Sequence, residues 1–229
     1  MPDRLLIMKL LKNNKLFLSL VLLGFFWACS DTPPEIIQYY TQPNLLRDET
    51  SGEVFHQFSV FLHLEDEDGT DDIESIFLIH DEEELFWELN SENWTTVTTD
   101  SETWIGSNGI AFPGGLAPAK GLFRIFVLDA AGERTVEELY IQPPEKSSKV
   151  AFPQLDIRDD GSLFIKSTGR EHTLWYYDDS GSIVESHKTS DRNVPVPKSA
   201  DRISQVYVYS YSDENGCGVI SGPYQLPGS

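Results

Sequence analysis

Apolar and polar side chains alternate along several short segments of this chain. In residues 54–64, Gln57, Ser59 and His63 fall on one face, and the other face carries Val54, His56, Phe58, Val60, Leu62 and Leu64. A repeat of two residues predicts a strand with one buried side. Similar short patterns, separated by turn-forming Asp and Gly residues, predict further strands at residues 73–79, 121–128, 135–141, 155–157, 163–165, 173–177, 182–184, 206–211 and 224–226.

No segment has a sustained repeat of 3.6 residues, and residues 81–89 predict one or two helical turns at most. Many short strands with frequent turn sequences favour β-sandwiches over alternating β–α units, so we predict an all-β fold. Pro143-Pro144 and Ser147-Ser148 are typical of a domain boundary. The pattern therefore predicts an acidic β-sandwich at residues 41–143, a linker at 144–149 and a smaller β-sandwich at 150–229.

The first 28 residues have the pattern of an export signal. Basic residues precede an apolar run at residues 16–28, which is shorter than the roughly 20 residues that span a bilayer. The run ends in Ala28-Cys29-Ser30, and a small residue directly before a cysteine resembles bacterial lipoprotein signals. This resemblance implies cleavage after Ala28 and acylation of Cys29, which leaves residues 29–40 as a tether. In the alternative interpretation, an ordinary signal peptidase cuts before Asp31.

Charge excludes one class of partner. The chain has 37 acidic and 17 basic residues and a formal net charge of −20, which opposes binding to the phosphates of nucleic acids. The charge is uneven, because residues 48–119 contain 18 acidic residues and neither Lys nor Arg. This stretch has two interpretations: it keeps the protein soluble, or it attracts cations or a basic protein surface.

Four sequence passages resemble known β-sandwich families. FLHLEDEDGTDDI (residues 61–73) and GLFRIFVLDAAGERT (residues 121–135) resemble a loop passage and the closing hairpin of bacterial surface Ig-like domains. TLWYYDDSG (residues 173–181) and VYVYSYSDENGCGVISGP (residues 206–223) resemble a middle strand and the last hairpin of fibronectin type III domains. These resemblances imply two tandem Ig-like or fibronectin type III-like β-sandwiches after a lipoprotein signal peptide.

A dense group of carboxylates is the candidate metal site. Asp66, Asp68, Asp71 and Asp72 lie within seven residues of each other, and loop carboxylates suit Ca²⁺. Their spacing does not match an EF-hand, so any Ca²⁺ site would draw ligands from separate loops. The competing interpretation is a solvated acidic turn, in which Asp side chains accept hydrogen bonds from their own backbone. No other cofactor is expected.

Aromatic residues are the candidate ligand contacts. Trp87, Trp94 and Trp104 are close together in the first predicted domain, where they can stack on sugar rings or fill the core between two sheets. In the second domain, Tyr207, Tyr209 and Tyr211 share one face of a predicted strand. That face is either a contact surface or a solvated sheet face with its hydroxyls in water.

Motifs for catalysis are absent from the sequence. It contains no GxSxG, HExxH, Walker or GxGxxG sequence, and its five histidines lack metal-ligand spacing. We therefore predict a non-catalytic binding or scaffolding module, attached to the bacterial cell envelope by its lipid anchor and facing the periplasm or the surface. Its partner is a protein or a glycan. The alternatives are a glycan-binding surface lipoprotein of a carbohydrate uptake system and an envelope hydrolase.

Overall fold

The computed structural model describes residues 32–67, 69–99, 102–112, 119–143, 150–158, 160–197 and 199–226. In these ranges the regular elements are β-strands, apart from single 3₁₀ turns at Thr70–Asp72 and Ala200–Arg202. The all-β prediction is thus confirmed. Within the same ranges, no helix is both long enough and apolar enough to span a bilayer. The predicted signal peptide, Cys29 and the linker 144–149 lie outside the described residues.

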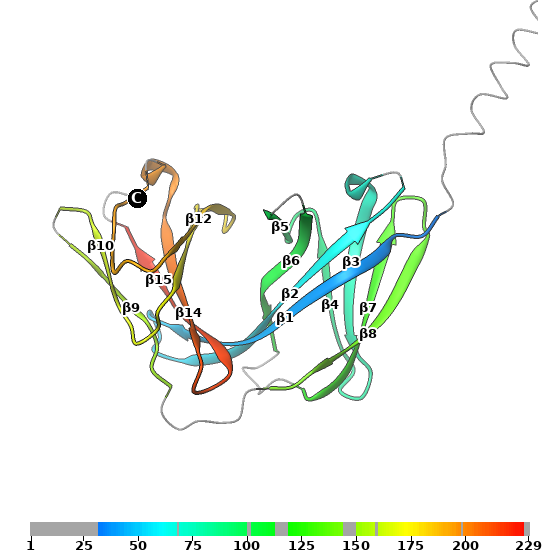
Figure 1. Ribbon diagram of the computed structural model, residues 1–229, viewed down its shortest axis with the longest axis horizontal. Helices are drawn as coiled ribbons and strands as arrows, with labels where there is room; N and C mark the ends of the chain where they lie inside the picture. Colours follow the sequence, from blue (N-terminus) through cyan, green and yellow to red (C-terminus); the bar gives the residue numbers. More distant parts are fainter. Residues whose placement is uncertain are drawn as a thin grey trace, which may run out of the picture.

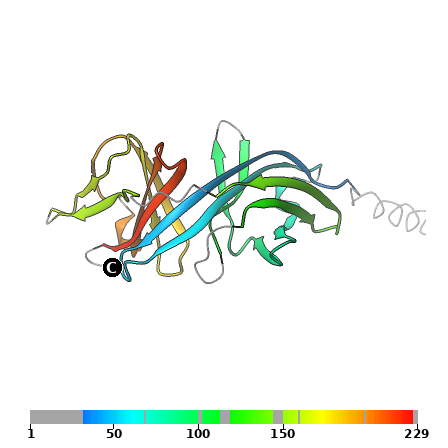
Figure 2. The same cartoon turned by 90° about the horizontal axis from the view of Figure 1, so that it is seen from below.

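The largest of the three described sheets runs through the whole molecule (Figure 1). Its eight strands are, in spatial order, β12 (Ile183–Thr189), β11 (His172–Tyr177), β14 (Gln205–Ser212), β15 (Cys217–Gln225), β1 (Glu35–Asp48), β2 (Val54–Glu65), β6 (Glu102–Ala111) and β5 (Thr95–Thr99). Neighbouring strands are antiparallel except β1 and β15, which pair in parallel from Asn44 with Gly218 to Asp48 with Gly222. Seen from below in Figure 2, β1 and β2 run from one end of the molecule to the other.

Two smaller sheets pack on the same face of this large sheet, one at each end. The first consists of β4 (Leu85–Asn90), β3 (Ile73–His80), β7 (Gly121–Asp129) and β8 (Arg134–Ile141). The second consists of β13 (Asn193–Val194), β10 (Leu163–Lys166) and β9 (Gln154–Ile157). The result is two sandwich-like lobes joined by a continuous sheet. We call residues 35–143 lobe one and residues 150–226 lobe two.

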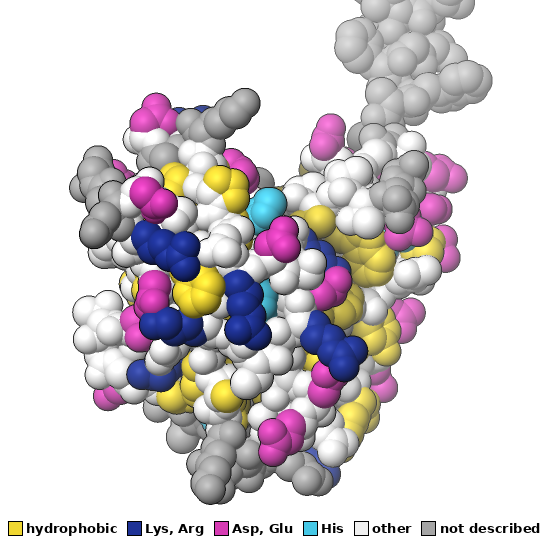
Figure 3. All heavy atoms as spheres, turned by 60° about the vertical axis from the view of Figure 1, so that its left-hand side comes forward, with side chains coloured by type: hydrophobic (Ala, Val, Ile, Leu, Met, Phe, Trp, Pro, Cys, Tyr) yellow, Lys and Arg dark blue, Asp and Glu magenta, His cyan; other side chains and the backbone are white. Residues whose placement is uncertain are grey.

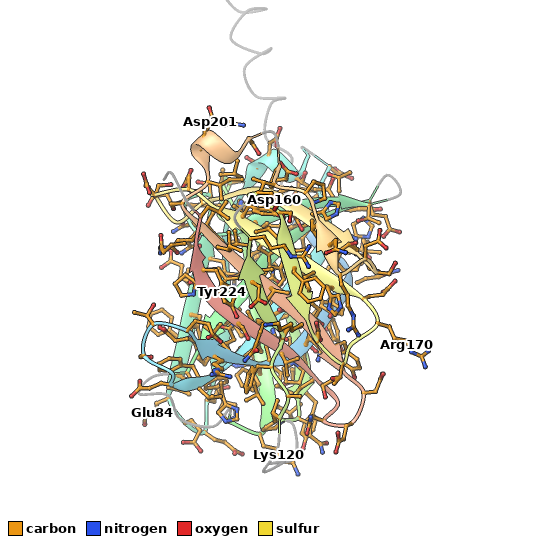
Figure 4. All side chains as sticks on the ribbon, turned by 90° about the vertical axis from the view of Figure 1, so that its left-hand side faces the viewer. Glu84, Lys120, Asp160, Arg170, Asp201 and Tyr224 are labelled. Carbon is orange, nitrogen blue, oxygen red and sulfur yellow. The ribbon has the colours of Figure 1, made fainter. Side chains whose placement is uncertain are left out.

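Each lobe has its own hydrophobic core. In lobe one, Phe58, Leu62, Phe123 and Ile125 are fully buried between the eight-stranded and four-stranded sheets. In lobe two, the core includes Leu163, Ile165, Leu174 and Val208, and Tyr224 of β15 packs against it near the middle of the view in Figure 4. A small third cluster lies where the lobes meet, and it contains Leu45, Cys217, Val219, Val150 and Phe152.

Two sequence-based predictions differ from the structure. Residues 35–40, assigned to the tether, form the start of β1, because hydrogen bonding to β2 orders a segment whose own apolar pattern is weak. Residues 81–89 contain no helical turn: the chain reverses after His80 and β4 begins at Leu85. The reason is that Leu85, Trp87 and Leu89 alternate along a strand and face the core of lobe one.

Candidate functional site

The face of the eight-stranded sheet opposite the two smaller sheets is concave. No described strand covers it, and its two edge strands, β5 and β12, lie on opposite sides of the gap between the lobes (Figure 1). Residues from both lobes line a cleft of about 720 Å³ here, with a smaller recess of about 250 Å³ at its base. We call this the interlobe cleft; its lining includes Trp94, Thr96, Asn108, Trp175, Tyr177 and Ser186.

Aromatic rings form the wall that lobe two contributes. Trp175 and Tyr177 alternate along β11 with Leu174 and Tyr176, which belong to the core of lobe two, so strand alternation directs Trp175 and Tyr177 to the cleft. The Trp175 ring centroid lies 5.4 Å from that of Tyr209, and Tyr177 packs edge-on against Tyr207 at 5.2 Å. Burial, and then the neighbouring Tyr207, raise the pKa of Tyr177 to about 12. Its hydroxyl is therefore a neutral hydrogen-bonding group at physiological pH.

The opposite wall comes from lobe one and is richer in hydroxyl groups. Strand β5 has the sequence TTVTT, and Thr95, Thr96 and Thr98 line the cleft. Trp94, which directly precedes β5, lines the same wall and also packs against the core of lobe one. This wall thus offers one large ring together with small neutral donors and acceptors.

Polar side chains occupy the middle of the concave face. Asn44 Nδ2 donates to Ser59 Oγ at 2.8 Å, and Ser59 Oγ donates to Asn108 Oδ1 at 3.0 Å. Gln57 Nε2 donates to the backbone oxygen of Asn108 at 3.2 Å. Asn44, Gln57 and Ser59 are buried, and Asn44 Oδ1 has no hydrogen-bond partner among the described residues. Of these side chains, Gln57 and Asn108 line the recess at the base of the cleft, so neutral amides form part of that base.

Basic side chains lie elsewhere on lobe two. Figure 3 brings this lobe forward and shows Lys and Arg side chains gathered on its outer face. Lys166 pairs with Asp156 and Lys188 with Glu171 at the surface, while Arg158 stacks over a phenylalanine ring. Among the described residues that line the interlobe cleft there is neither Lys nor Arg. The cleft is therefore poorly suited to an anionic ligand.

A second depression lies on the lobe-one part of the concave face. It measures about 440 Å³, and we call it the aromatic hollow; its lining residues are Tyr40, Phe61, Val97, Thr99, Glu102 and Trp104. Trp104 Nε1 donates to Glu102 Oε2 at 3.3 Å, and the Trp104 ring lies 5.6 Å from that of His63.

The three tryptophans predicted as ligand contacts occupy three different environments. Trp87 packs among Phe58, Phe112 and Phe123 and donates to the backbone oxygen of Ala111 at 2.9 Å, so it belongs to the core of lobe one. Trp94 lines the interlobe cleft and Trp104 the aromatic hollow. The structure therefore does not bring these three rings together in one patch.

The acidic loop has a simple local structure in its described part. Asp71 and Asp72 lie in the 3₁₀ turn before β3, and the backbone oxygen of Asp72 accepts from Ala130 at 2.9 Å. Asp66 precedes this turn, whereas Asp68 lies outside the described residues. Among the described residues, no three His, Cys, Asp or Glu side chains are grouped so that they could hold a metal ion.

Several lining residues were not identified from the sequence. Trp175 and Tyr177 alternate with core residues in a predicted strand. This alternation alone could have indicated that both rings lie on the face opposite the core. Gln57 was placed correctly on the face opposite the core side chains of β2. No sequence pattern places Asn108 in the cleft, because its position depends on the pairing of β6 with β2.

Comparisons with known proteins identify no family. No family model matches this chain, and no curated protein matches it. Among solved structures, dimeric latent PorU from Porphyromonas gingivalis is similar with 16% identity and a TM-score of 0.33 over 85% of this chain. The match spans 21% of the PorU chain. Dpr11 IG1 bound to DIP-gamma IG+IG2 is similar with 12% identity and a TM-score of 0.27, over 83% of this chain and 98% of that chain.

Proposed function

We propose that this protein is a lipid-anchored binding module of the bacterial cell envelope that holds its ligand in the interlobe cleft and performs no catalysis. The observation that carries this proposal is the uncovered concave face, where aromatic walls flank a base of neutral amides. Ligand sites typically combine a concave, largely apolar surface with a few oriented polar groups. In the described lining, the charged residues are the carboxylates Glu92 and Glu185, without a histidine, cysteine or lysine beside them.

The proposed architecture is a pair of Ig-like or fibronectin type III-like sandwiches that share a sheet. Support comes from the two separate cores and from the packing of one smaller sheet on each end of the large sheet. In this arrangement β1 continues the sheet of lobe two, through its pairing with β15. The relative position of the two lobes, and thus the shape of the cleft, depends on this pairing.

A neutral glycan is the ligand that the cleft chemistry favours. Sugar rings present C–H faces that stack on aromatic rings, and hydroxyl groups that bond to amides and hydroxyls. Trp175 and Trp94 supply rings on opposite walls, and Asn108 and the threonines of β5 supply polar groups. This is the chemistry of the second candidate function, a glycan-binding surface lipoprotein of a carbohydrate uptake system. A protein partner remains the alternative.

The cleft is tested with purified, unacylated protein on an array of neutral oligosaccharides, followed by calorimetric titration of any glycan that binds. Removing one stacking ring typically costs about 1 kcal/mol or more, so we expect Trp175→Ala and Tyr207→Ala to weaken binding by roughly tenfold. Tyr140→Ala is the matched control, because Tyr140 is an exposed ring on β8, away from the cleft. Binding that survives both cleft substitutions would refute the proposed site.

The anchor is tested separately with the Cys29→Ser variant. Stable attachment needs two or more acyl chains, and the lipoprotein interpretation provides them through Cys29. We expect the wild-type protein to partition into the detergent phase and the variant into the aqueous phase. Equal partitioning of the two proteins would contradict the lipoprotein interpretation and favour ordinary cleavage.

A further inference from the structure

The rings of the aromatic hollow come from three adjacent strands. Tyr40 on β1 lies opposite Phe61 on β2, and Trp104 on β6 lies opposite His63, two residues along from Phe61. Cross-strand and diagonal neighbours on one sheet face are close enough for aromatic side chains to touch. The three rings therefore line one depression, which Val97 of β5 borders at the side of Trp104.

A carboxylate lies at the edge of these rings. Glu102 precedes Trp104 by two residues and so shares its face of β6. The bond that Glu102 Oε2 accepts from Trp104 Nε1, at 3.3 Å, holds the carboxylate beside the indole ring. Neither Lys nor Arg occurs among the lining residues of the hollow, and none occurs in residues 48–119. The negative charge of Glu102 therefore lacks a cationic side chain within the hollow.

We propose that the aromatic hollow binds a small organic cation of the quaternary ammonium class. Aromatic faces attract cations through the ring quadrupole, and a nearby carboxylate adds a full negative charge. The acidic surroundings raise the local concentration of cations before they bind. The volume of about 440 Å³ lies within the range of small-ligand sites. Among the described residues, Val97 is common to the linings of this hollow and the interlobe cleft, but the rings and the carboxylate proposed to hold the cation line the hollow alone.

The polar groups of the hollow favour a quaternary over a primary ammonium ion. A primary ammonium has three hydrogen-bond donors that must be satisfied when water is removed. Half of the lining side chains, namely Phe61, Val97 and Trp104, offer no acceptor for these donors, and one oxygen of Glu102 already accepts a bond from Trp104. A quaternary ammonium has no donors to satisfy, so methyl groups can lie against the rings without an unpaired polar atom.

The test uses choline as the probe and its neutral isostere 3,3-dimethyl-1-butanol as the comparison. Binding is measured by isothermal titration calorimetry and by tryptophan fluorescence at constant ionic strength. We expect saturable binding of choline and at least tenfold weaker binding of the isostere. Equal binding of both compounds would show an apolar pocket without cation recognition and would overturn the proposal. Failure of choline to reach saturation would overturn it as well.

Substitutions locate the site and separate it from the cleft. Glu102→Gln keeps the size of the side chain and removes its charge, and we expect roughly tenfold weaker choline binding. Trp104→Ala should weaken it at least as much, whereas Trp104→Phe keeps a ring and should retain part of the affinity. Trp175→Ala, in the cleft, should leave choline binding unchanged. If Trp175→Ala abolishes binding and Glu102→Gln does not, the cation occupies the cleft and the proposal is wrong.

Discussion

The side-chain oxygen Oδ1 of Asn44 on β1 occupies the space that a Cβ atom would take at Gly218 on β15. The two residues are register partners in the parallel pair that joins the lobes, and such a Cβ would also lie 2.5 Å from Tyr209 Cε2. Glycine at this position therefore allows the Asn44 amide to lie across β15 while it donates to Ser59. The close approach of these strands depends on the missing side chain.

The Gly218→Ala variant should be clearly less stable than the wild type. The added methyl group must displace the Asn44 amide or the Tyr209 ring, and overpacking of this kind costs about 1–3 kcal/mol of unfolding free energy. Urea denaturation measures the change. Gly109→Ala is the control, because no described atom lies within 4 Å of a Cβ at that position. An unchanged midpoint for Gly218→Ala would mean that the β1–β15 contact adapts without cost.

The two lobes should unfold in a single transition. The eight-stranded sheet crosses from one lobe to the other, and Leu45 of β1 packs on Val219 of β15. Leu163→Ala removes a fully buried side chain from the core of lobe two and should cost about 2–5 kcal/mol. Calorimetry should then show one peak at a lower temperature, with equal calorimetric and van't Hoff enthalpies.

The control for this experiment is Leu122→Ala, because Leu122 on β7 is 58% exposed and its loss should change stability by about 0.5 kcal/mol or less. Two separate peaks, of which Leu163→Ala moves only one, would mean that each lobe unfolds independently despite the shared sheet.

His172 should make the protein sensitive to mild acid. Its ring is 1% exposed, and Nδ1 lies 2.6 Å from Ser210 Oγ. Burial, and then the positive charge of Arg192, lower the pKa of His172 below its usual 6.5. Below pH 6.5 the unfolded state therefore binds a proton that the folded state does not, so stability falls as the pH decreases, by at most about 1.4 kcal/mol per pH unit.

Urea denaturation at several pH values between 7 and 5 checks this dependence. The His172→Asn variant, which keeps a polar side chain near Ser210, should lose the histidine contribution and have a flatter profile. Carboxylates whose pKa is lowered, such as Asp48 and Asp81, lose their contribution to stability as the pH falls below about 5, and both proteins share them. A wild-type profile as flat as that of the variant would contradict the prediction.

The acidic loop should respond to calcium as it responds to any salt. Charges in residues 48–119 repel one another, and screening of this repulsion depends on ionic strength alone. We expect equal melting temperatures in CaCl₂, MgCl₂ and NaCl at matched ionic strength. A specific site would instead stabilise the folded state in proportion to RT ln(1 + [L]/Kd), about 2.7 kcal/mol at a hundredfold excess over Kd. Ca²⁺-selective stabilisation that Asp66→Asn with Asp68→Asn abolishes would establish such a site.

Local patterns predicted the strands that bury one face. In β2, the core side chains Phe58, Val60 and Leu62 recur at every second position, and this spacing is visible without any knowledge of the neighbouring strands. Strand β1 could not be predicted in the same way. Its middle contains Pro43 and Asn44, and its order comes from pairing with β2 along its length and with β15 far along the chain.

The candidate site was only partly visible in the sequence. The face shared by Tyr207 and Tyr209 followed from alternation, but two facts that make it a cleft wall did not. The smaller sheets leave this face uncovered, and the curvature of the large sheet brings β5 opposite β12. Both depend on pairings between distant segments. Trp87 was predicted as a ligand contact and instead packs in the core of lobe one. The sequence pattern around a tryptophan does not distinguish a core ring from a ligand-binding ring.

The position of β15 between β14 and β1 determines the order in which the sheet can assemble during synthesis. The β1–β2 hairpin can form as soon as residues 35–65 have been made, but the other edge of β1 stays open until residues 217–225 follow. Pairing over such a sequence distance is slow, and an open strand edge is a template for pairing between molecules. The nascent protein therefore passes through an aggregation-prone interval, which lasts until β15 covers the open edge of β1.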